Sequence, residues 1–197
     1  MNVGVPAERA PGEKRVALVP AVAKKLVDNG HELYISAGAG EPAGWADEAY
    51  EDVGCTVLSD REELFETASV ILQVQALGAA PDIEMDPYQD GQVVVGLLGP
   101  YDITDEQLEA LAERNVSAFS MELIPRISRA QSMDALSSQA SLGGYKAALL
   151  AADGLPKMFP MEMTAAGTIR PAEVFVIGAG VAGLKAIATA KRLGARV

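Results

Sequence analysis

Short apolar runs alternate along the chain with longer stretches in which apolar residues recur at helical spacing. The runs predict strands at residues 2–6, 32–36, 55–58, 70–74, 93–98, 116–123 and 173–177. The helical spacing predicts helices at residues 20–28, 47–53, 60–67, 104–114, 131–152 and 183–193. Strands that are apolar on both faces are typical of a parallel sheet covered by helices, so the pattern predicts an α/β fold.

The order of these elements predicts two Rossmann-like parallel-sheet domains joined by a long helix. We place the N-terminal domain at residues 1–130, the connecting helix at 131–153 and the start of a second domain at 154–197. The last range stops inside the second strand of a βαβ unit, at Arg196 and Val197. We therefore expect the second domain to be truncated and the chain to be a fragment.

Composition narrows the class of protein. Acidic residues number 27 against 16 basic ones, for a net charge of −11, so a basic nucleic-acid-binding surface is not expected. The single cysteine, Cys55, cannot form an internal disulfide and is predicted to be a small buried residue. No apolar run has the length of a membrane span, and the N-terminus lacks the pattern of a signal peptide. We therefore expect a cytoplasmic protein.

A dense polar cluster occupies residues 125–139, directly after the predicted strand 116–123. Ser128 and Gln131 have the spacing of a capping box at the start of the long helix. Helical geometry would place Gln131, Asp134, Ser137 and Ser138 on roughly one face, and Met133, Leu136 and Ala140 on the other. Open α/β sheets bind ligands beyond the carboxyl ends of their strands, so this cluster is a candidate binding site. The alternative is a solvated, well-capped helix start.

A second candidate is the sequence Gly178-Ala-Gly180-Val-Ala-Gly183, which lies between an apolar run and a helix. In that context, the first glycine allows a tight turn, the second allows close approach of a pyrophosphate, and the third allows helix–strand packing. The helix N-terminus would then offer free N–H groups to the phosphates. The alternative is a glycine-rich turn in an ordinary βα unit. The acidic residue that holds the ribose is expected about 20 residues later, past Val197, so the choice between NAD and NADP cannot be made.

Three stretches carry a resemblance to a known family: Arg126-Ile-Ser-Arg-Ala-Gln-Ser-Met-Asp-Ala-Leu-Ser-Ser-Gln, Met161-Glu-Met-Thr-Ala-Ala-Gly-Thr, and the sequence that opens at Gly178. They resemble the NAD(H)-binding domain of the proton-translocating NAD(P) transhydrogenase alpha subunit. The N-terminal Gly4-Val-Pro-Ala-Glu-Arg is similar both to that family and to its relative alanine dehydrogenase. The resemblance covers the whole chain, and the first stretch is the most specific of the three.

The resemblance implies an oxidoreductase that binds NAD(H) and exchanges hydride directly with NADP(H) held on a partner domain. It also implies membrane-spanning partner subunits that couple this exchange to proton translocation. The domain itself would be a homodimer in the cytoplasm, peripheral to the cell membrane through those partners, and it would bind no nucleic acid.

The resemblance also assigns roles to particular residues. Arg126 and Gln131 would border the nicotinamide, and Gln131 would reach toward the partner's nucleotide. Asp134 and Ser137 would hold the nicotinamide amide and neighbouring side chains. These four form the implied catalytic set, and no metal ligand is implied. The implied cofactor-binding set is Arg126, Ile127, Ser128, Arg129, Gln131, Ser132, Met133, Asp134, Leu136, Ser137, Gly178, Gly180, Val181 and Gly183.

An amino-acid dehydrogenase like alanine dehydrogenase is the first alternative function. That chemistry needs a group that polarises or protonates the substrate carbonyl, and the relatives use an arginine, a lysine and a histidine. Arg15 stands at the arginine position, but Gln75 and Leu97 stand at the other two. Arg15 also has a purely structural interpretation, as an ion-pair residue. The only histidine, His31, is expected to be exposed in a turn. A non-catalytic NAD(H)-sensing module is the second alternative.

Overall fold

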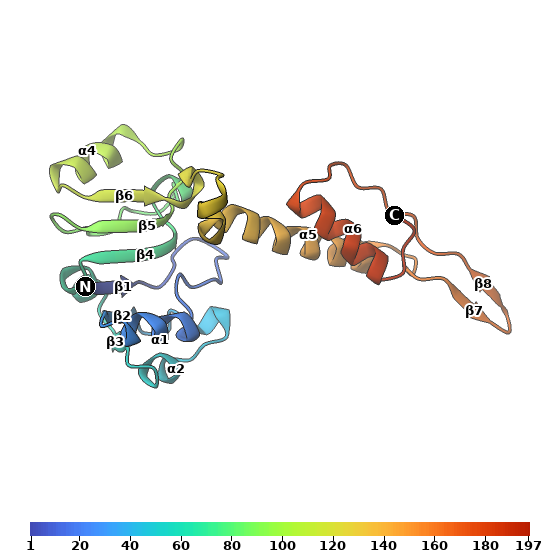
Figure 1. Cartoon of the computed structure of the whole chain (residues 1–197), viewed down its shortest axis with the longest axis horizontal. Coiled ribbons are helices and arrows are strands. Elements are labelled where there is room, and N and C mark those ends of the chain that lie inside the picture. Colours follow the sequence, from blue (N-terminus) through green and yellow to red (C-terminus); the bar gives the residue numbers. More distant parts are fainter. The chain divides into compact units, whose positions relative to one another are not determined.

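The computed structural model describes all residues, 1–197, and divides into two compact units, Met1–Pro125 and Arg126–Val197. The elements of both units are labelled in Figure 1. Each unit is described by itself below.

The first unit contains six strands and four α-helices. The strands are β1 (Asn2–Val5), β2 (Glu32–Ser36), β3 (Thr56–Leu58), β4 (Val70–Gln75), β5 (Val93–Leu97) and β6 (Ser117–Ser120). The helices are α1 (Pro20–Asp28), α2 (Asp47–Glu51), α3 (Arg61–Thr67) and α4 (Asp105–Glu113), and short 3-10 helices are η1 (Glu41–Ala43), η2 (Leu77–Ala79) and η3 (Met121–Leu123). Each strand except β6 coincides with a predicted apolar run to within about two residues at either end.

All six strands are parallel, in the order β3-β2-β1-β4-β5-β6 (Figure 1). This is the order of a doubly wound Rossmann-like sheet, and its direction reverses between β1 and β4. The predicted α/β fold class is therefore confirmed.

The two faces of this sheet carry separate apolar clusters. Val3 and Val5 of β1 pack in one cluster, with residues of α1 and α2. A Cβ added at Gly4 would lie 2.8 Å from Leu64 and from Ala68, which belong to the other cluster, formed with α3 and α4. Alternate residues of a strand point to opposite faces, so helices cover both sides of the sheet. Cys55 is buried in the first of these clusters, as predicted.

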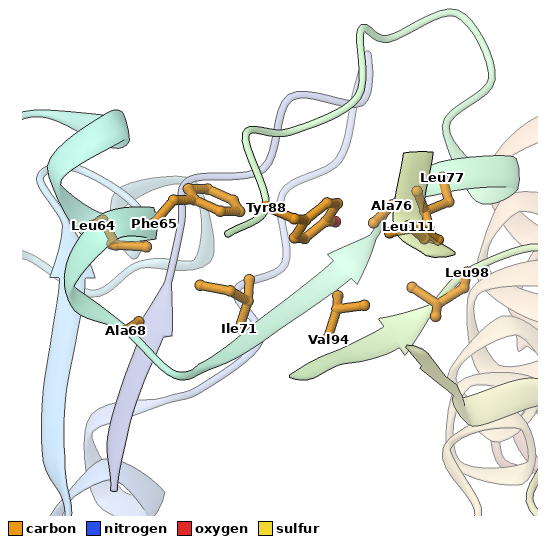
Figure 2. Packing of buried hydrophobic residues seen from close by; sticks show 10 residues of the cluster. All are labelled: Leu64, Phe65, Ala68, Ile71, Ala76, Leu77, Tyr88, Val94, Leu98 and Leu111. Atoms are coloured by element: carbon orange, nitrogen blue, oxygen red, sulfur yellow. The ribbon is translucent and has the colours of Figure 1, made fainter. Parts of the chain in front are cut away.

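Figure 2 shows the second cluster, in which the ring of Tyr88 lies beside Phe65 and above Ile71. The Phe65 and Tyr88 rings meet edge to face, with centroids 5.5 Å apart. The Tyr88 hydroxyl donates a hydrogen bond of 2.7 Å to Oε1 of Gln73. The long segment between β4 and β5 is therefore held down by an aromatic anchor.

A buried polar network continues from Gln73. Its Nε2 donates to Oδ2 of Asp86 at 2.7 Å, and Oδ1 of Asp86 accepts from Nε of Arg61 at 2.8 Å. Arg9 forms an ion pair with the same Asp86 at 3.0 Å. The adjoining hollow has a volume of about 20 Å³, enough for one water molecule, so the network stabilises the fold and does not form a ligand site.

The strand predicted at 116–123 is shorter and more exposed than the sequence indicated. β6 is the edge strand of the sheet, and the side chain of Phe119 is 60% exposed. Residues Met121–Leu123 form η3 instead of continuing the strand. The carboxylate of Glu122 accepts hydrogen bonds from the N–H groups of Leu98 and Gly99, which draws this turn over the end of β5. The prediction of a buried strand was wrong, because an edge strand has only one neighbour.

The second unit contains η4 (Ser128–Met133), α5 (Ala135–Gly154), β7 (Glu162–Thr164), β8 (Gly167–Ile169) and α6 (Val181–Arg192). β7 and β8 form an antiparallel hairpin, which the sequence did not reveal because its turn lacks an Asn-Gly or Asp-Gly pair. The strand predicted at 173–177 forms a single parallel bridge, between Glu173 and Arg196. Ile177 is 91% exposed, since no further strand of this unit pairs with the run.

No helix in either unit combines the length and the apolar character that crossing a membrane requires.

Candidate functional site

The glycines of the 178–183 sequence form a tight turn that leads into α6. Gly178 has a φ of +103°, a conformation that side-chain-bearing residues rarely adopt. A Cβ at Gly183 would lie 2.9 Å from the carbonyl carbon of Gly178 and closer still to its oxygen. Both positions therefore require glycine for the turn to close against the helix.

The first turn of α6 is left open for a ligand. Its N-cap residue is Gly180, no side chain caps it, and no acidic residue occupies its first turn. The first hydrogen bond along the helix runs from Leu184 N–H to the Gly180 carbonyl, so the preceding N–H groups have no partner within the helix. A Cβ at Gly180 would meet nothing within 4 Å, so the glycine leaves free space beside these donors. Such a helix end favours a bound anion.

This helix end opens onto a hollow of about 420 Å³ in the second unit. That volume lies within the range of small-molecule and cofactor sites. The residues that line it are Arg126, Leu136, Ser137, Ala140, Ile177, Gly178, Gly180, Val181, Ala182 and Gly183. A cationic side chain, a hydroxyl and backbone N–H groups thus converge with apolar side chains, an arrangement that suits a dinucleotide.

The start of α5 differs from the prediction. Asp134 is the N-cap residue: its Oδ1 accepts the N–H of Ser137 at 2.8 Å and its Oδ2 accepts the Ser137 hydroxyl at 2.6 Å. The capping box predicted from Ser128 and Gln131 is not formed, since Ser128–Met133 is the 3-10 helix η4, which has no side-chain cap. A carboxylate three residues before Ser137 provides a stronger cap than the Ser128 hydroxyl.

The predicted site residues separate into two groups. Seven of them line the hollow: Arg126, Leu136, Ser137, Gly178, Gly180, Val181 and Gly183. The others do not line it: Ile127, Ser128, Arg129, Gln131, Ser132, Met133 and Asp134. Gln131 is exposed on η4 and does not share a helical face with Asp134, Ser137 and Ser138, so the predicted single polar face was wrong. Asp134 contributes indirectly, through Ser137.

Three lining residues were not predicted: Ala140, Ile177 and Ala182. Ala140 lies one helical turn after Ser137, and Ile177 directly precedes Gly178. These neighbours of the two motifs were the available signal, but small and apolar side chains resemble ordinary packing residues.

The charge of Asp134 is stabilised locally. Hydrogen bonds from the Ser137 hydroxyl and N–H, together with the nearby charge of Arg126, lower the pKa of the Asp134 carboxyl. It is therefore ionised at neutral pH and acts as a hydrogen-bond acceptor rather than as an acid.

The residues considered for amino-acid chemistry lie in the first unit. Gln75 and Leu97 are register partners in the β4–β5 pair, so the two positions are neighbours at the ends of these strands. Arg15 donates from Nε to Oε1 of Glu13 at 2.8 Å. His31 is half-buried before β2, with its Nδ1 buried and without a hydrogen-bond partner, so the expected exposed histidine was wrong.

Carboxylates occupy the backbone N–H groups near the carboxyl ends of three strands of this unit. Glu8 accepts from Val74 and Gln75 at 2.6 and 3.0 Å. Glu122 accepts from Leu98 at 3.2 Å and from Gly99 at 3.0 Å, and Asp47 accepts from Gly38 at 2.9 Å. These donors are therefore not available to a ligand.

Comparison with protein families accounts for both units. Residues 4–143 match the family domain described as "Alanine dehydrogenase/PNT, N-terminal domain", and residues 147–197 match "Alanine dehydrogenase/PNT, C-terminal domain". The chain belongs to the alanine dehydrogenase/PNT family. The resemblance drawn from the sequence is thereby confirmed.

Within this family, the chain is similar to the first of the polypeptides that make up the NAD(P) transhydrogenase alpha subunit of Rhodospirillum rubrum, with 48% identity over 100% of the chain and 52% of that protein. Its structure is similar to that of "transhydrogenase from Sinorhizobium meliloti", with a TM-score of 0.89, 44% identity, and coverage of 99% of the chain and 57% of that chain. The similarity to "Alanine dehydrogenase" of Methanococcus maripaludis is lower, at 30% identity over 100% of the chain and 52% of that protein. The chain therefore spans about half the length of the curated relatives it matches.

Proposed function

We propose that this chain is the NAD(H)-binding component of an NAD(P) transhydrogenase alpha subunit. The observation that carries the proposal is the open N-terminus of α6, which faces Arg126 and Ser137 across one hollow. The higher identity to transhydrogenase alpha subunits than to alanine dehydrogenase supports the choice within the family.

The two ends of the hollow suit the two ends of a dinucleotide. The N–H groups of Val181, Ala182 and Gly183 would hold the pyrophosphate, and Gly180 leaves the space that it needs. Arg126 and Ser137 would border the nicotinamide, with Asp134 fixing the orientation of the Ser137 hydroxyl. When bound, the nicotinamide supplies or accepts the hydride.

The protein's own task in such a reaction is alignment and exclusion of water. Hydride exchange between two nicotinamides needs no protein acid or base, and the ionised Asp134 is suited to positioning. Gln131, exposed on η4, would reach the NADP(H) of a partner domain. The remaining residues of this stretch, Ile127, Ser128, Arg129, Ser132 and Met133, would frame the same surface.

The finer assignments follow from the same proposal. The name of the Rhodospirillum rubrum relative describes one portion of an alpha subunit, which supports partner subunits. We assign to these partners the NADP(H) site and the membrane-spanning segments that couple hydride exchange to proton translocation. The chain would act as a homodimer in the cytoplasm, peripheral to the membrane.

An amino-acid dehydrogenase is the weaker candidate. Its chemistry needs an acid or cation beside the substrate carbonyl, and the paired positions 75 and 97 carry an amide and an aliphatic side chain. An NAD(H)-sensing module would use the same hollow, and only an activity measurement separates it from the enzyme.

The test uses the full-length protein that carries this chain. It is mixed with NADH and a separately prepared NADP-binding partner domain, and reduction of an NADP analogue is followed by absorbance. A parallel sample holds pyruvate and ammonia without the partner. We expect hydride transfer only in the first sample. NADH consumption in the second would establish an amino-acid dehydrogenase, and NADH binding without transfer in either would establish a sensing module.

Two variants assign the roles. Gln131→Asn should slow hydride transfer far more than it weakens NADH binding, since the shorter amide misplaces the two rings. Gly180→Val should weaken NADH binding itself, because its side chain fills the space beside the open N–H groups. Equal loss of rate and affinity in the first variant, or unchanged affinity in the second, would contradict the assigned role.

A further inference from the structure

Gly144 is the position at which α5 comes closest to the first turn of α6. It is a buried residue in the middle of α5. A Cβ added there would lie 2.8 Å from the carbonyl carbon and 2.9 Å from the Cα of Ala182, and nearer still to the carbonyl oxygen. Protein cores are close-packed, so even one added methyl group at such a contact forces the neighbouring atoms to move.

The neighbour at this contact is backbone, not a side chain. A crowded side chain can adopt another rotamer, whereas the Ala182 peptide is fixed by the helix that it belongs to. Ala182 is the second residue of α6 and lines the hollow. An added methyl group at position 144 would therefore displace the first turn of α6, where the open N–H groups lie.

The same turn has a second backbone contact. Gly183 follows Ala182 and lies against the carbonyl group of Gly178, with no room for a Cβ. A displacement of the turn at Ala182 would thus also change its fit against Gly178. The position of the N–H donors depends on two glycine contacts, of which only the one within the 178–183 sequence belongs to the nucleotide fingerprint.

We propose that Gly144 is a positioning residue for dinucleotide binding: by allowing α5 to touch the Ala182 peptide, it places the N-terminal N–H groups of α6 for the pyrophosphate. This inference rests on the proposed NAD(H) binding. Gly144 does not line the hollow, so it would act only through Ala182.

Gly143 offers a matched control. It is the preceding residue of the same helix, it is exposed, and a Cβ there would meet nothing within 4 Å. Gly143→Ala and Gly144→Ala raise the intrinsic helix propensity of α5 equally. They differ only in the contact with Ala182.

The experiment measures binding of NADH and of ADP-ribose to the full-length protein by calorimetry. We expect Gly144→Ala to raise both dissociation constants by about tenfold or more, the effect of losing one hydrogen bond to a charged group, at unchanged binding stoichiometry. Equal effects on the two ligands would place the defect at the pyrophosphate, because ADP-ribose lacks the nicotinamide. Gly143→Ala should bind both ligands as the parent protein does.

A second measurement separates this inference from the proposed function. In the ligand-free protein, the amide NMR signals of Val181, Ala182 and Gly183 should shift in Gly144→Ala and stay in place in Gly143→Ala. If the parent protein binds no NADH, the proposed function fails, while these shifts still report whether Gly144 positions the turn.

Three results would overturn the inference. One is equal affinity of the two variants for NADH. Another is a Gly144→Ala protein that loses binding stoichiometry but keeps its affinity, which would indicate partial unfolding. The third is failure of both Gly144→Ala and the double variant Gly143→Ala/Gly144→Ala to fold, which would leave Gly144 with a packing role alone.

Discussion

Asp134 holds both hydrogen-bonding groups of Ser137. Its Oδ1 accepts the backbone N–H at 2.8 Å and its Oδ2 accepts the hydroxyl at 2.6 Å. One carboxylate therefore both begins α5 and fixes the orientation of a hydroxyl that lines the hollow. The stability of the helix start and the geometry of the site depend on the same side chain.

We predict that Asp134→Ala lowers the melting temperature and also weakens NADH binding, because it removes the cap and releases Ser137. Ser138→Ala is the control, since its hydroxyl donates only to the backbone oxygen of Asp134, at 3.0 Å. Thermal denaturation and NADH titration of both variants check this. A weaker effect on binding in Asp134→Ala than in Ser138→Ala would show that Asp134 does not orient the site.

We predict a loss of stability in alkali that depends on Tyr50. Its hydroxyl donates to the carbonyl of Leu18 at 2.9 Å, and burial raises the pKa of Tyr50 to about 12. A folded-state pKa above the usual 10 favours folding while tyrosine is protonated in both states, and that contribution is lost as the pH rises from 10 through 12. Urea unfolding at several pH values should show a shallower alkaline decline in Tyr50→Phe than in the parent. Parallel declines would place the titrating group elsewhere.

We predict that Asp86→Ala destabilises the first unit by about 3 kcal/mol, because it leaves buried guanidinium and amide groups without their acceptor. Arg61, Arg9 and Gln73 all bond to this carboxylate. Asp90→Ala provides the comparison, since Asp90 is exposed and bonds to Asn115, and its effect should stay within about 0.5 kcal/mol. Denaturant unfolding measures both, and similar values would show that the network contributes little.

We predict that Gly143→Ala stabilises the protein by about 1 kcal/mol, because alanine is the better helix former and the position is open. Gly30→Ala should have the opposite effect, about 1 kcal/mol of destabilisation, although its position is equally open, since its φ of +83° strains a residue with a Cβ. Differential scanning calorimetry of the two variants checks the signs. The same sign for both would show that neither backbone conformation determines the outcome.

Local patterns were sufficient for much of the fold. The apolar runs of β1, β2, β4 and β5 predicted buried parallel strands, because central strands of such a sheet are covered on both faces. The edge strand β6 looks the same in sequence, and only the sheet order reveals that one of its sides has no neighbour.

The site was predicted less completely, for reasons of distance along the chain. The glycine turn is a local signal and was found. The contact between Gly144 and Ala182 joins residues of two helices, and a glycine within a helical pattern does not reveal what lies against it. Glu8 and Val74 are likewise joined by a hydrogen bond across 66 positions. Asp134 was placed in the site, but competition between two possible helix caps was decided by geometry that spacing alone does not contain.

The carboxylates of Glu8, Asp47 and Glu122 give the first sheet a property that its strand order alone would not suggest. A doubly wound sheet commonly receives the phosphate groups of a nucleotide at backbone donors beyond its strands. Here these donors already hold anions that belong to the protein itself, so free phosphate or a second dinucleotide meets occupied donors and repulsion between like charges. Each chain should therefore take up one dinucleotide at saturation, even though the first sheet is built like a nucleotide-binding one.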